Sequence, residues 1–507
     1  MKRLFALLLS LMMVAACIPA MADEPVTLEM MLVTNANYTH GDPDWDRTII
    51  NEVEKAVGVK LDITWISSEG SKEKVSTMLA GNNLPDIFSP GVDVASLVEE
   101  GAIMALDPYI DRIANYTRHL PTSTEVAVRN VSDGMLYQVN MLTQVSPAYA
   151  MVVRKDWLDN MGIENVPVTI DEWIEVWRRV RDEDVNKNGD PNDEVPFVDP
   201  STFTSGNAGM SLLMAYGIES NGLWYVDDNG TYSLVYSHER FGEYLELMRQ
   251  LYSENLIDQE VFTNNGTAVA TLFNSNSAFS GYQWASRCSN TTATLADTVP
   301  EVMLIPVAPV KESGQLIPAR NLHGSTFVFS YELENDPAKL DAALRLIDFM
   351  YSDEGIELTN YGLEGVHHTV VDGKKIVVPE LCEPSATAAR HAGLICQQFP
   401  TLWNNDNYVQ MNTQNKPYEE LTLAEQLTYQ GTQIYWDNYY TMPPSLATPA
   451  VVEYSADIYS KIDELYANCV TGKITVEDFF KEYEALKPYG LQEILDQGQE
   501  YYDQLVK

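Results

Sequence analysis

An acidic loop near residue 190 has the oxygen chemistry of a metal site. Asp184, Asn186 and Asn188 occupy loop positions one, three and five, and Gly189 at position six can supply a turn. Calcium takes six to eight oxygen ligands, and a loop of this kind offers them at alternate positions. At position seven, Asp190 can offer its main-chain carbonyl. The expected ligands are the oxygen-bearing residues of the loop: Asp184, Asn186, Asn188, Asp190, Asp193 and Glu194.

The loop departs from an EF-hand at its end. An EF-hand has a bidentate Glu at position twelve, whereas Val195 stands there and the acids Asp193 and Glu194 occupy positions ten and eleven. Residues 195–197 are predicted to be extended, so no second helix follows. The pattern favours a calcium loop that caps a single helix. The alternative is a solvated turn, which Asn, Asp and Gly form readily without metal.

The aromatic composition favours a carbohydrate ligand. The chain has 28 Tyr and 9 Trp against 14 Phe, and flat rings with a polar edge suit sugars, whose C–H faces stack on them. Most such residues in any protein are half-buried and structural, and this alternative applies to each candidate. The aromatic candidates, which we expect in loops beside Gly or Asn, are Trp284, Tyr282, Trp224, Tyr361 and Trp403.

Further candidates are polar. Asn37 and Tyr38 follow the first predicted strand, and Glu364 lies in a Gly-Leu-Glu-Gly turn, with a plain surface turn as its alternative role. The sequence contains no H-E-x-x-H, G-x-S-x-G or P-loop motif. His367 and His368 are adjacent, so on an extended chain they point to opposite faces. We expect no enzyme, although a pair of carboxylates for glycoside hydrolysis stays open as an alternative.

The metal loop is preceded by a strand and two helices. Residues 149–154 are predicted to be a strand, and a short helix follows with Asp156 as its N-cap and Gly162 as its stop. A second helix begins with a capping box at Thr169 and Glu172. Its apolar residues recur at three- and four-residue spacing, which predicts burial along one side. They are Ile170, Trp173, Ile174, Trp177 and Val180.

The region before residue 90 alternates between strands and helices. Strands are expected at 26–33, 59–66 and 84–89, with helices from residue 42 to Gly58 and over 71–81. Repeated βαβ units predict a parallel sheet, and ligands bind beyond the carboxyl ends of its strands.

Several short motifs resemble one protein family. They are the Arg154-Lys-Asp-Trp-Leu corner, the Pro167-x-Thr-x-x-Glu-Trp helix start, the D-x-N-x-N-G-D loop from Asp184, Leu84-Pro-Asp-Ile87, Asp133-Gly-Met-Leu-Tyr137 and the Ser352–Gly365 segment. Together they resemble the carbohydrate-type extracellular solute-binding proteins of ABC importers. The resemblance is nearest to the branch that binds oligosaccharides and carries a structural calcium, and it spans roughly residues 26 to 370.

The resemblance implies an α/β periplasmic-binding-protein-like fold of two lobes joined by a hinge, each a mostly parallel sheet flanked by helices. We expect the first lobe at 23–147 plus about 310–370 and the second at 148–309 plus about 371–507, with crossings near 145–150, 300–310 and 370. The lobes would close over an oligosaccharide and present it to the permease subunits. A secreted glycoside hydrolase or lyase, and a peptide-binding receptor, are the competing hypotheses.

The charge balance restricts the partners. The chain has 73 acidic and 32 basic residues, a formal net charge of −41. Such a surface repels phosphate backbones and anionic headgroups, which argues against binding to nucleic acid or to a membrane surface. A neutral ligand is favoured over a polyanionic one. We expect a monomer.

The N-terminus predicts export. Lys2 and Arg3 precede an apolar core, and Ala20-Met21-Ala22 reads as a cleavage site that ends a 22-residue signal peptide. Alternatively, Val14-Ala-Ala-Cys17 reads as a lipobox, which would make Cys17 a lipid anchor at the cell surface. No other stretch reaches the length of a membrane-spanning helix. The remaining cysteines form no C-x-x-C pair, and their disulfide status stays open. They are Cys288, Cys382, Cys396 and Cys469.

Overall fold

The structure of the chain is a computed structural model. The structure describes residues 25–34, 47–120, 125, 128–130, 133–143, 149–199, 210–264, 266–284, 286–308, 317–319, 323–377, 400–403, 417–437, 439–441 and 443–505. Asn37, Tyr38, Cys17, Cys382 and Cys396 lie outside these residues.

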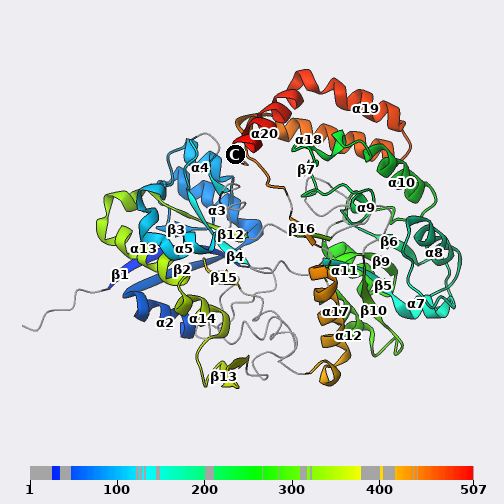
Figure 1. Ribbon diagram of the computed structural model, residues 1–507, viewed down its shortest axis with the longest axis horizontal. Coiled ribbons are helices and arrows are strands. Elements are labelled where there is room, and N and C mark those ends of the chain that lie inside the picture. Colours follow the sequence, from blue (N-terminus) through cyan, green and yellow to red (C-terminus); the bar gives the residue numbers. More distant parts are fainter. Residues whose placement is uncertain are drawn as a thin grey trace, which may run out of the picture.

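Two separate sheets organise the chain, and the first has six strands (Figure 1). In spatial order they are β15 (Leu402–Trp403), β4 (Gln138–Thr143), β12 (His323–Phe329), β3 (Ile87–Phe88), β1 (Val26–Thr34) and β2 (Val59–Ser67). β1 pairs in parallel with β2 and β3, and β15 pairs in parallel with β4. Only β12 runs against its neighbours β3 and β4.

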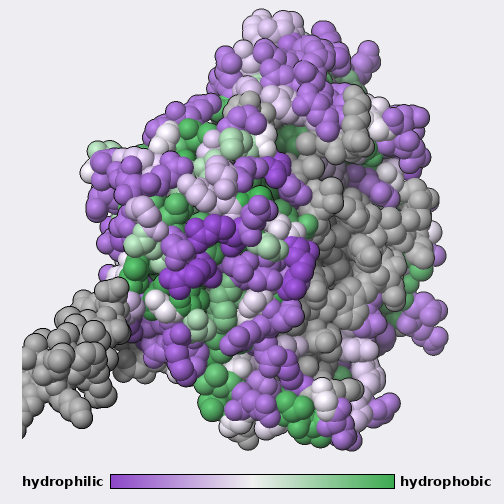
Figure 2. All heavy atoms as spheres, turned by 60° about the vertical axis from the view of Figure 1, so that its left-hand side comes forward, coloured by the Kyte–Doolittle hydropathy of each residue, from purple (hydrophilic) through white to green (hydrophobic). Residues whose placement is uncertain are grey.

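Helices cover both faces of this sheet, so strand β1 has buried side chains on each face. Leu28, Met30 and Leu32 pack against α2 and α13, whereas Met31 faces α3 and α4. The alternation follows from the two-residue period of a strand. The helices of this lobe are α2 (Arg47–Val57), α3 (Ser68–Ala80), α4 (Val94–Glu99), α5 (Ala114–His119), α13 (Pro337–Met350) and α14 (Asp353–Tyr361). The exterior of this lobe is mostly hydrophilic (Figure 2), as the acidic composition predicts.

The second sheet has four strands, in the order β10 (Leu304–Val307), β5 (Tyr149–Arg154), β9 (Ala278–Trp284) and β6 (Val195–Val198). β5 is antiparallel to both β10 and β9, and only β6 and β9 are parallel. The expectation of a mostly parallel sheet is therefore wrong for this lobe. β5 and β10 are the strands through which the chain enters and leaves the lobe, so no βαβ connection fixes their direction.

Ten described helices belong to this lobe. They are α7 (Lys155–Asn160), α8 (Ile170–Asp182), α9 (Met210–Ala215), α10 (Phe241–Ser253), α11 (Gly266–Asn274), α12 (Ser286–Leu295), α17 (Leu423–Asp437), α18 (Pro449–Val470), α19 (Val476–Ala485) and α20 (Leu491–Leu505). The capping box of α8 is confirmed, and the five apolar residues predicted for its inner face are all buried in the main core of this lobe. Cys288 and Cys469 are buried free thiols.

Smaller elements complete the fold. The strand pairs are β7 (Trp224–Val226) with β8 (Tyr232–Leu234), β11 (Ile317–Ala319) with β16 (Tyr439–Thr441), and β13 (His368–Val371) with β14 (Lys374–Val377). The 3-10 helices are η1 (Asp107–Ile113), η3 (Val235–Ser237), η4 (Tyr331–Asn335), η6 (Tyr418–Glu420) and η7 (Lys487–Tyr489). None of the described helices combines the length and the apolar composition that crossing a bilayer requires.

The chain passes between the sheets more than once. β4 ends at Thr143 in the first sheet and β5 begins at Tyr149 in the second, while β10 ends at Val307 and β12 begins at His323. The tail differs from the expectation that everything after about 371 joins the second lobe. Leu402 pairs with Leu142, so β15 extends the first sheet before α17 packs on the second.

A buried ion pair fixes the corner between β5 and α7. Arg154 is fully buried, and its guanidinium donates from Nε and Nη2 to the two carboxylate oxygens of Asp156 at 2.8 and 2.5 Å. The same carboxylate accepts the main-chain amide of Met303 at 3.2 Å. Asp156 was expected to be the N-cap of this helix. It lies inside the first turn instead, because the buried arginine requires a carboxylate there.

Candidate ligand-binding site and metal loop

Strand direction defines one edge of the first sheet as a candidate site. β1, β2, β3, β4 and β15 all run the same way, so their carboxyl ends lie at one edge, where the antiparallel β12 begins. Ligands of open α/β sheets bind beyond this edge. Trp403 is the last residue of β15 and pairs with Thr143, the last residue of β4.

The second sheet has a matching edge. β9 ends at Trp284, which pairs with Tyr149, the first residue of β5. β6 is parallel to β9, so it ends at the same edge. β10 and β9 are both antiparallel to β5, so β10 also runs in the direction of β9 and ends at this edge.

The chain itself links the two edges. Thr143 and Tyr149 are six residues apart, a span of at most about 21 Å. Trp403 and Trp284 lie opposite these two residues, each one strand spacing away, about 5 Å. The two tryptophan backbones are therefore within roughly 30 Å, on edges that the chain also connects from β10 to β12. The space between these edges, which we call the inter-sheet site, is the candidate ligand site.

Among the other predicted aromatic residues, Tyr282 is the one placed on the same strand as Trp284. It lies on β9 two residues before Trp284 and is 6% exposed. Trp224 is different. It is 2% exposed in the main core of the second lobe, where its ring stacks on Tyr232 with centroids 4.5 Å apart. A sugar could reach its ring only by displacing core side chains, so its surroundings are those of a structural residue.

Tyr361 and Glu364 lie in another place, at the end of α14. Tyr361 is buried, with the Lys375 ammonium 4.9 Å from its ring centre. Its carbonyl lies 2.9 Å from Nδ1 of the buried His368. Glu364 is exposed and lines a hollow of about 720 Å³ between α2 and α14. Other carboxylates share this hollow, namely Glu52, Asp353, Glu354 and Glu357.

The turn at Glu364 depends on a glycine. Gly362 has φ +69°, and a Cβ at this residue would come within 2.6 Å of the His367 ring. The His367 ring in turn accepts the Leu363 amide through Nδ1 at 2.9 Å. Burial lowers the pKa of His367, with the neighbouring His368 adding to the shift, so the neutral ring that accepts this bond is favoured at physiological pH.

Side-chain oxygens of the acidic loop accept several hydrogen bonds from within the loop. Asp184 accepts the main-chain amides of Asn188 and Gly189 at 3.1 and 3.0 Å, and Asn186 accepts the same Asn188 amide at 2.9 Å. The Asp193 carboxylate accepts the side-chain amides of Asn186 and Asn188 at 3.0 and 2.6 Å. The positive φ of Gly189, +95°, allows the turn predicted at position six.

Glu194 gives the loop an unsatisfied oxygen. Its Oε2 is buried and has no hydrogen-bond partner among the described residues. Burial raises the pKa of Glu194, and the nearby charges of Asp193 and Asp184 add to the shift. Across the described residues, no three or more His, Cys, Asp or Glu side chains converge as a metal cluster. Asn amide oxygens make up the remainder of this loop's donor set, so the residues fit a calcium ion through mixed amide and carboxylate ligands.

The loop lies at the edge of the second sheet away from Trp284. It ends where β6 begins, and the Val195 amide donates to the carbonyl of Ser277, which precedes β9. Trp284 is at the other end of β9, six residues along the strand and therefore about 20 Å away. A metal in this loop would not contact a ligand in the inter-sheet site.

Comparison with known proteins identifies the family. Residues 40–357 match the family described as bacterial extracellular solute-binding protein. The chain belongs to this family.

Relatives and solved structures of this solute-binding protein agree with the fold. It is 23% identical over 487 residues to the polygalacturonan/rhamnogalacturonan-binding protein YtcQ of Bacillus subtilis strain 168, covering 95% of this chain and 92% of that protein. The alginate-binding protein AlgQ2, in a structure without calcium ion, superposes with a TM-score of 0.68 at 23% identity, over 95% of this chain and 98% of that one. The S. pneumoniae ABC-transporter substrate-binding protein FusA was compared as an EF-hand mutant in complex with fructo-nystose. It superposes with a TM-score of 0.68 at 20% sequence identity, over 94% of this chain and 99% of that one.

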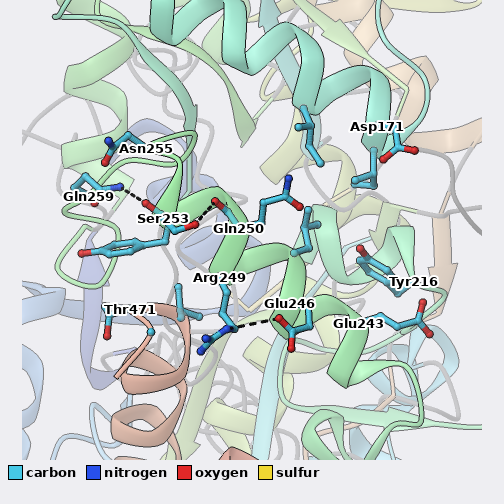
Figure 3. A pocket seen from close by; sticks show the side chains of 16 residues that line it. Asp171, Tyr216, Glu243, Glu246, Arg249, Gln250, Ser253, Asn255, Gln259 and Thr471 are labelled. Carbon is cyan, nitrogen blue, oxygen red and sulfur yellow. Dashed lines mark hydrogen bonds and ion pairs between the residues drawn. The ribbon is translucent and has the colours of Figure 1, made fainter. Parts of the chain in front are cut away.

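A surface hollow of about 930 Å³ lies outside the inter-sheet site of the solute-binding protein (Figure 3). It lies between α8 and α10, beside the turn after α18, and none of the predicted ligand residues lines it. Arg249 at its floor donates to the carbonyls of Cys469 and Ile474, both at 2.5 Å. These bonds hold α10 to the turn before α19, so Arg249 has a structural role.

Two further sets of residues bear on the inter-sheet site and were missed from the sequence. Asn360 on α14 donates to the Leu402 carbonyl at 2.8 Å, and Thr359 bonds Thr401 at 3.0 Å, so α14 supports the strand that carries Trp403. Arg287 lies in the first turn of α12, three residues after Trp284. Helix periodicity could place Asn360 on the inner side of α14, but no sequence signal pairs it with residue 402.

Proposed function

We propose that this protein is the extracytoplasmic substrate-binding component of an ABC importer for an oligosaccharide. The two lobes would close over the sugar between the facing sheet edges and release it unchanged to the permease. One observation carries the proposal: the chain repeatedly connects two strand edges that each end in a tryptophan, within a chain that belongs to a solute-binding family. A ligand that touches both edges stabilises the closed state, which is how binding shifts the population.

The carbohydrate class rests on the relatives and on ring chemistry. The compared proteins are described as binding polygalacturonan or rhamnogalacturonan, alginate and fructo-nystose, all of them carbohydrates. Trp284 and Trp403 would supply stacking platforms, and Tyr282 lies on the same strand as Trp284. Asn37 and Tyr38 remain proposed ligand residues on the strength of the sequence alone. Tyr361 and Glu364 remain proposals: Glu364 lines the hollow between α2 and α14, and Tyr361 is buried at the end of α14.

We further propose a structural calcium in the acidic loop. The unpartnered Glu194 oxygen and the oxygens of Asp184, Asn186, Asn188 and Asp193 support it. The ion would neutralise clustered carboxylates and fasten the end of α8 to the start of β6. One compared structure is of AlgQ2 without calcium ion, and another is of an EF-hand mutant of FusA.

Export and oligomeric state complete the proposal. The family is extracellular, which agrees with a signal at residues 1–22. A lipid anchor at Cys17, a monomeric state and the lobe limits, with β15 moved to the first lobe, remain proposals.

The test is a titration followed by analysis of the sugar. Binding should change tryptophan emission, and Trp284→Ala should weaken affinity by roughly ten- to a hundredfold, because losing a stacking platform costs on the order of 1–3 kcal/mol. Trp224→Phe is the matched control and should retain affinity, since its ring packs in the core. After a day with the protein, mass spectrometry should recover intact sugar. Shortened or unsaturated products would support the hydrolase or lyase hypothesis instead.

A further inference from the structure

Arg287 is a cation whose backbone lies close to that of Trp284, at the edge of the inter-sheet site. It is the second residue of α12 and follows Trp284 by three positions, a distance of at most about 11 Å along the backbone. Its side chain is half-buried, and its Nε is fully covered yet has no hydrogen-bond partner among the described residues.

The missing partner sets Arg287 apart from the other arginines. Each of the other eleven arginines that the structure describes forms an ion pair with a carboxylate. Several of them, such as Arg118 and Arg345, lie on the surface with half of the side chain exposed or nearly so. In a chain with 73 acids, an arginine that has no carboxylate partner among the described residues, three positions after Trp284, requires an explanation.

The energetic argument points the same way. Burial lowers the pKa of Arg287, yet a guanidinium remains protonated in proteins. A buried charge without a partner is unfavourable, and structural arginines avoid it by pairing, as Arg154 does with Asp156. Arg287 is only half-buried, but its Nε is covered and has no partner among the described residues, so we expect it to lower the stability of the ligand-free protein. A guanidinium recognises a carboxylate best, through two parallel hydrogen bonds.

We infer that Arg287 binds a carboxylate of the sugar, so the natural ligand is a uronic-acid oligosaccharide rather than a neutral one. The inference rests on the proposed function and narrows its substrate class. Polygalacturonan and alginate, which two of the compared proteins bind by description, are polymers of uronic acids.

This inference revises the expectation from net charge. The charge of −41 is spread over carboxylates that are mostly exposed, and their repulsion is screened beyond about 8 Å at physiological salt. A half-buried guanidinium acts at contact distance, where screening is weak. One cation in contact with the ligand can therefore favour an acidic sugar even though the net charge of the protein is negative.

The test compares two sugars that differ only in charge. Trigalacturonate and its carboxyl-reduced counterpart, a neutral galactose trisaccharide, are titrated into the full protein by calorimetry. The wild type should bind the acidic sugar at least about tenfold more tightly. Arg287→Gln should remove this preference by weakening the acidic sugar about ten- to a hundredfold while leaving the neutral sugar unchanged. Arg287→Lys should retain part of the preference.

Controls separate recognition from folding. Arg240→Gln, which removes a paired arginine of the same lobe, should leave the preference intact. Arg287→Gln should keep or raise the melting temperature without ligand, since it removes an unpaired charge, whereas loss of a structural arginine would lower it. A lowered melting temperature, or equal wild-type affinity for both sugars, would overturn the inference and leave oligosaccharide import standing. Failure to bind these sugars and fructo-oligosaccharides alike would overturn the proposed function itself.

Discussion

Replacing Asp184 by Ala should remove the response of this protein to calcium. Asp184 holds the first position of the acidic loop, where its two oxygens accept the amides of Asn188 and Gly189. Loss of the carboxylate removes one ligand directly, and it also releases the turn that aligns Asn186 and Asn188. We therefore expect the calcium-dependent stabilisation to disappear rather than to weaken slightly.

The size of the effect follows from linkage. Calcium at about a hundred times its dissociation constant stabilises a protein that binds it only when folded by about 2.7 kcal/mol. In a domain of 150–250 residues each kcal/mol shifts the melting temperature by about 2–4 °C, so the wild type should melt about 5–10 °C higher in calcium than in chelator. In chelator, Asp184→Ala should lose only its two turn hydrogen bonds, about 1 kcal/mol each.

The assay is thermal melting in calcium and in chelator, with Asp227→Ala as the control. Asp227 makes equivalent bonds in the turn between β7 and β8, where it accepts the amides of Asn229 and Thr231 at 2.9 and 2.8 Å. Both variants should be similarly destabilised in chelator, but only Asp184→Ala should lose the calcium increment. If calcium raises the melting temperature of Asp184→Ala as much as that of the wild type, the calcium site is refuted. If calcium does not change the melting temperature of the wild type, the loop is a turn that needs no metal.

Two further predictions concern buried charge. Burial and like charges raise the pKa of Glu194 above its ordinary value of 4.5, so the folded protein binds this proton more tightly than the unfolded chain does. The stability of the protein therefore falls as the pH rises from 4.5 through the raised pKa. Glu194→Gln should therefore melt higher than wild type in chelator at neutral pH and lose this advantage in acid; an advantage independent of pH would contradict this cause. Asp156→Asn should cost about 3–5 kcal/mol in chemical denaturation by stranding buried Arg154, against under about 1 kcal/mol for the more exposed Asp159→Asn; equal costs would contradict the buried pair.

Local signals were sufficient for α8 and the loop after it. The capping box at Thr169 and Glu172 and the spacing of Trp173 and Trp177 depend on neighbours within one helix, so the sequence contains them in full. The extended segment after the loop is confirmed as β6 for the same reason. Asp156 shows the limit, because a tertiary partner, Arg154, overrides a local capping preference.

Pairing and burial could not be predicted in the same way. A hydrophobic run identified β5 but not its partners. Tyr282 and Trp284 were expected in a loop but lie on strand β9, so the mixed pairing of the second sheet was missed. A tryptophan beside a turn can face a ligand or the core, and only the packing of Trp224 on Tyr232 separates the two. The lack of a carboxylate partner for Arg287 is likewise visible only in the structure, where each of the other eleven described arginines forms an ion pair.

Ligand-induced closure is the property that tests the account most directly, and small-angle X-ray scattering measures it. Titration of the purified protein with uronic-acid oligosaccharide should decrease the radius of gyration, since a sugar that contacts both sheet edges favours the closed state. The decrease should reach saturation at the same ligand concentration as the change in tryptophan emission, and Trp284→Ala should shift both to higher concentration. An unchanged radius of gyration at saturating ligand would contradict capture between two closing lobes.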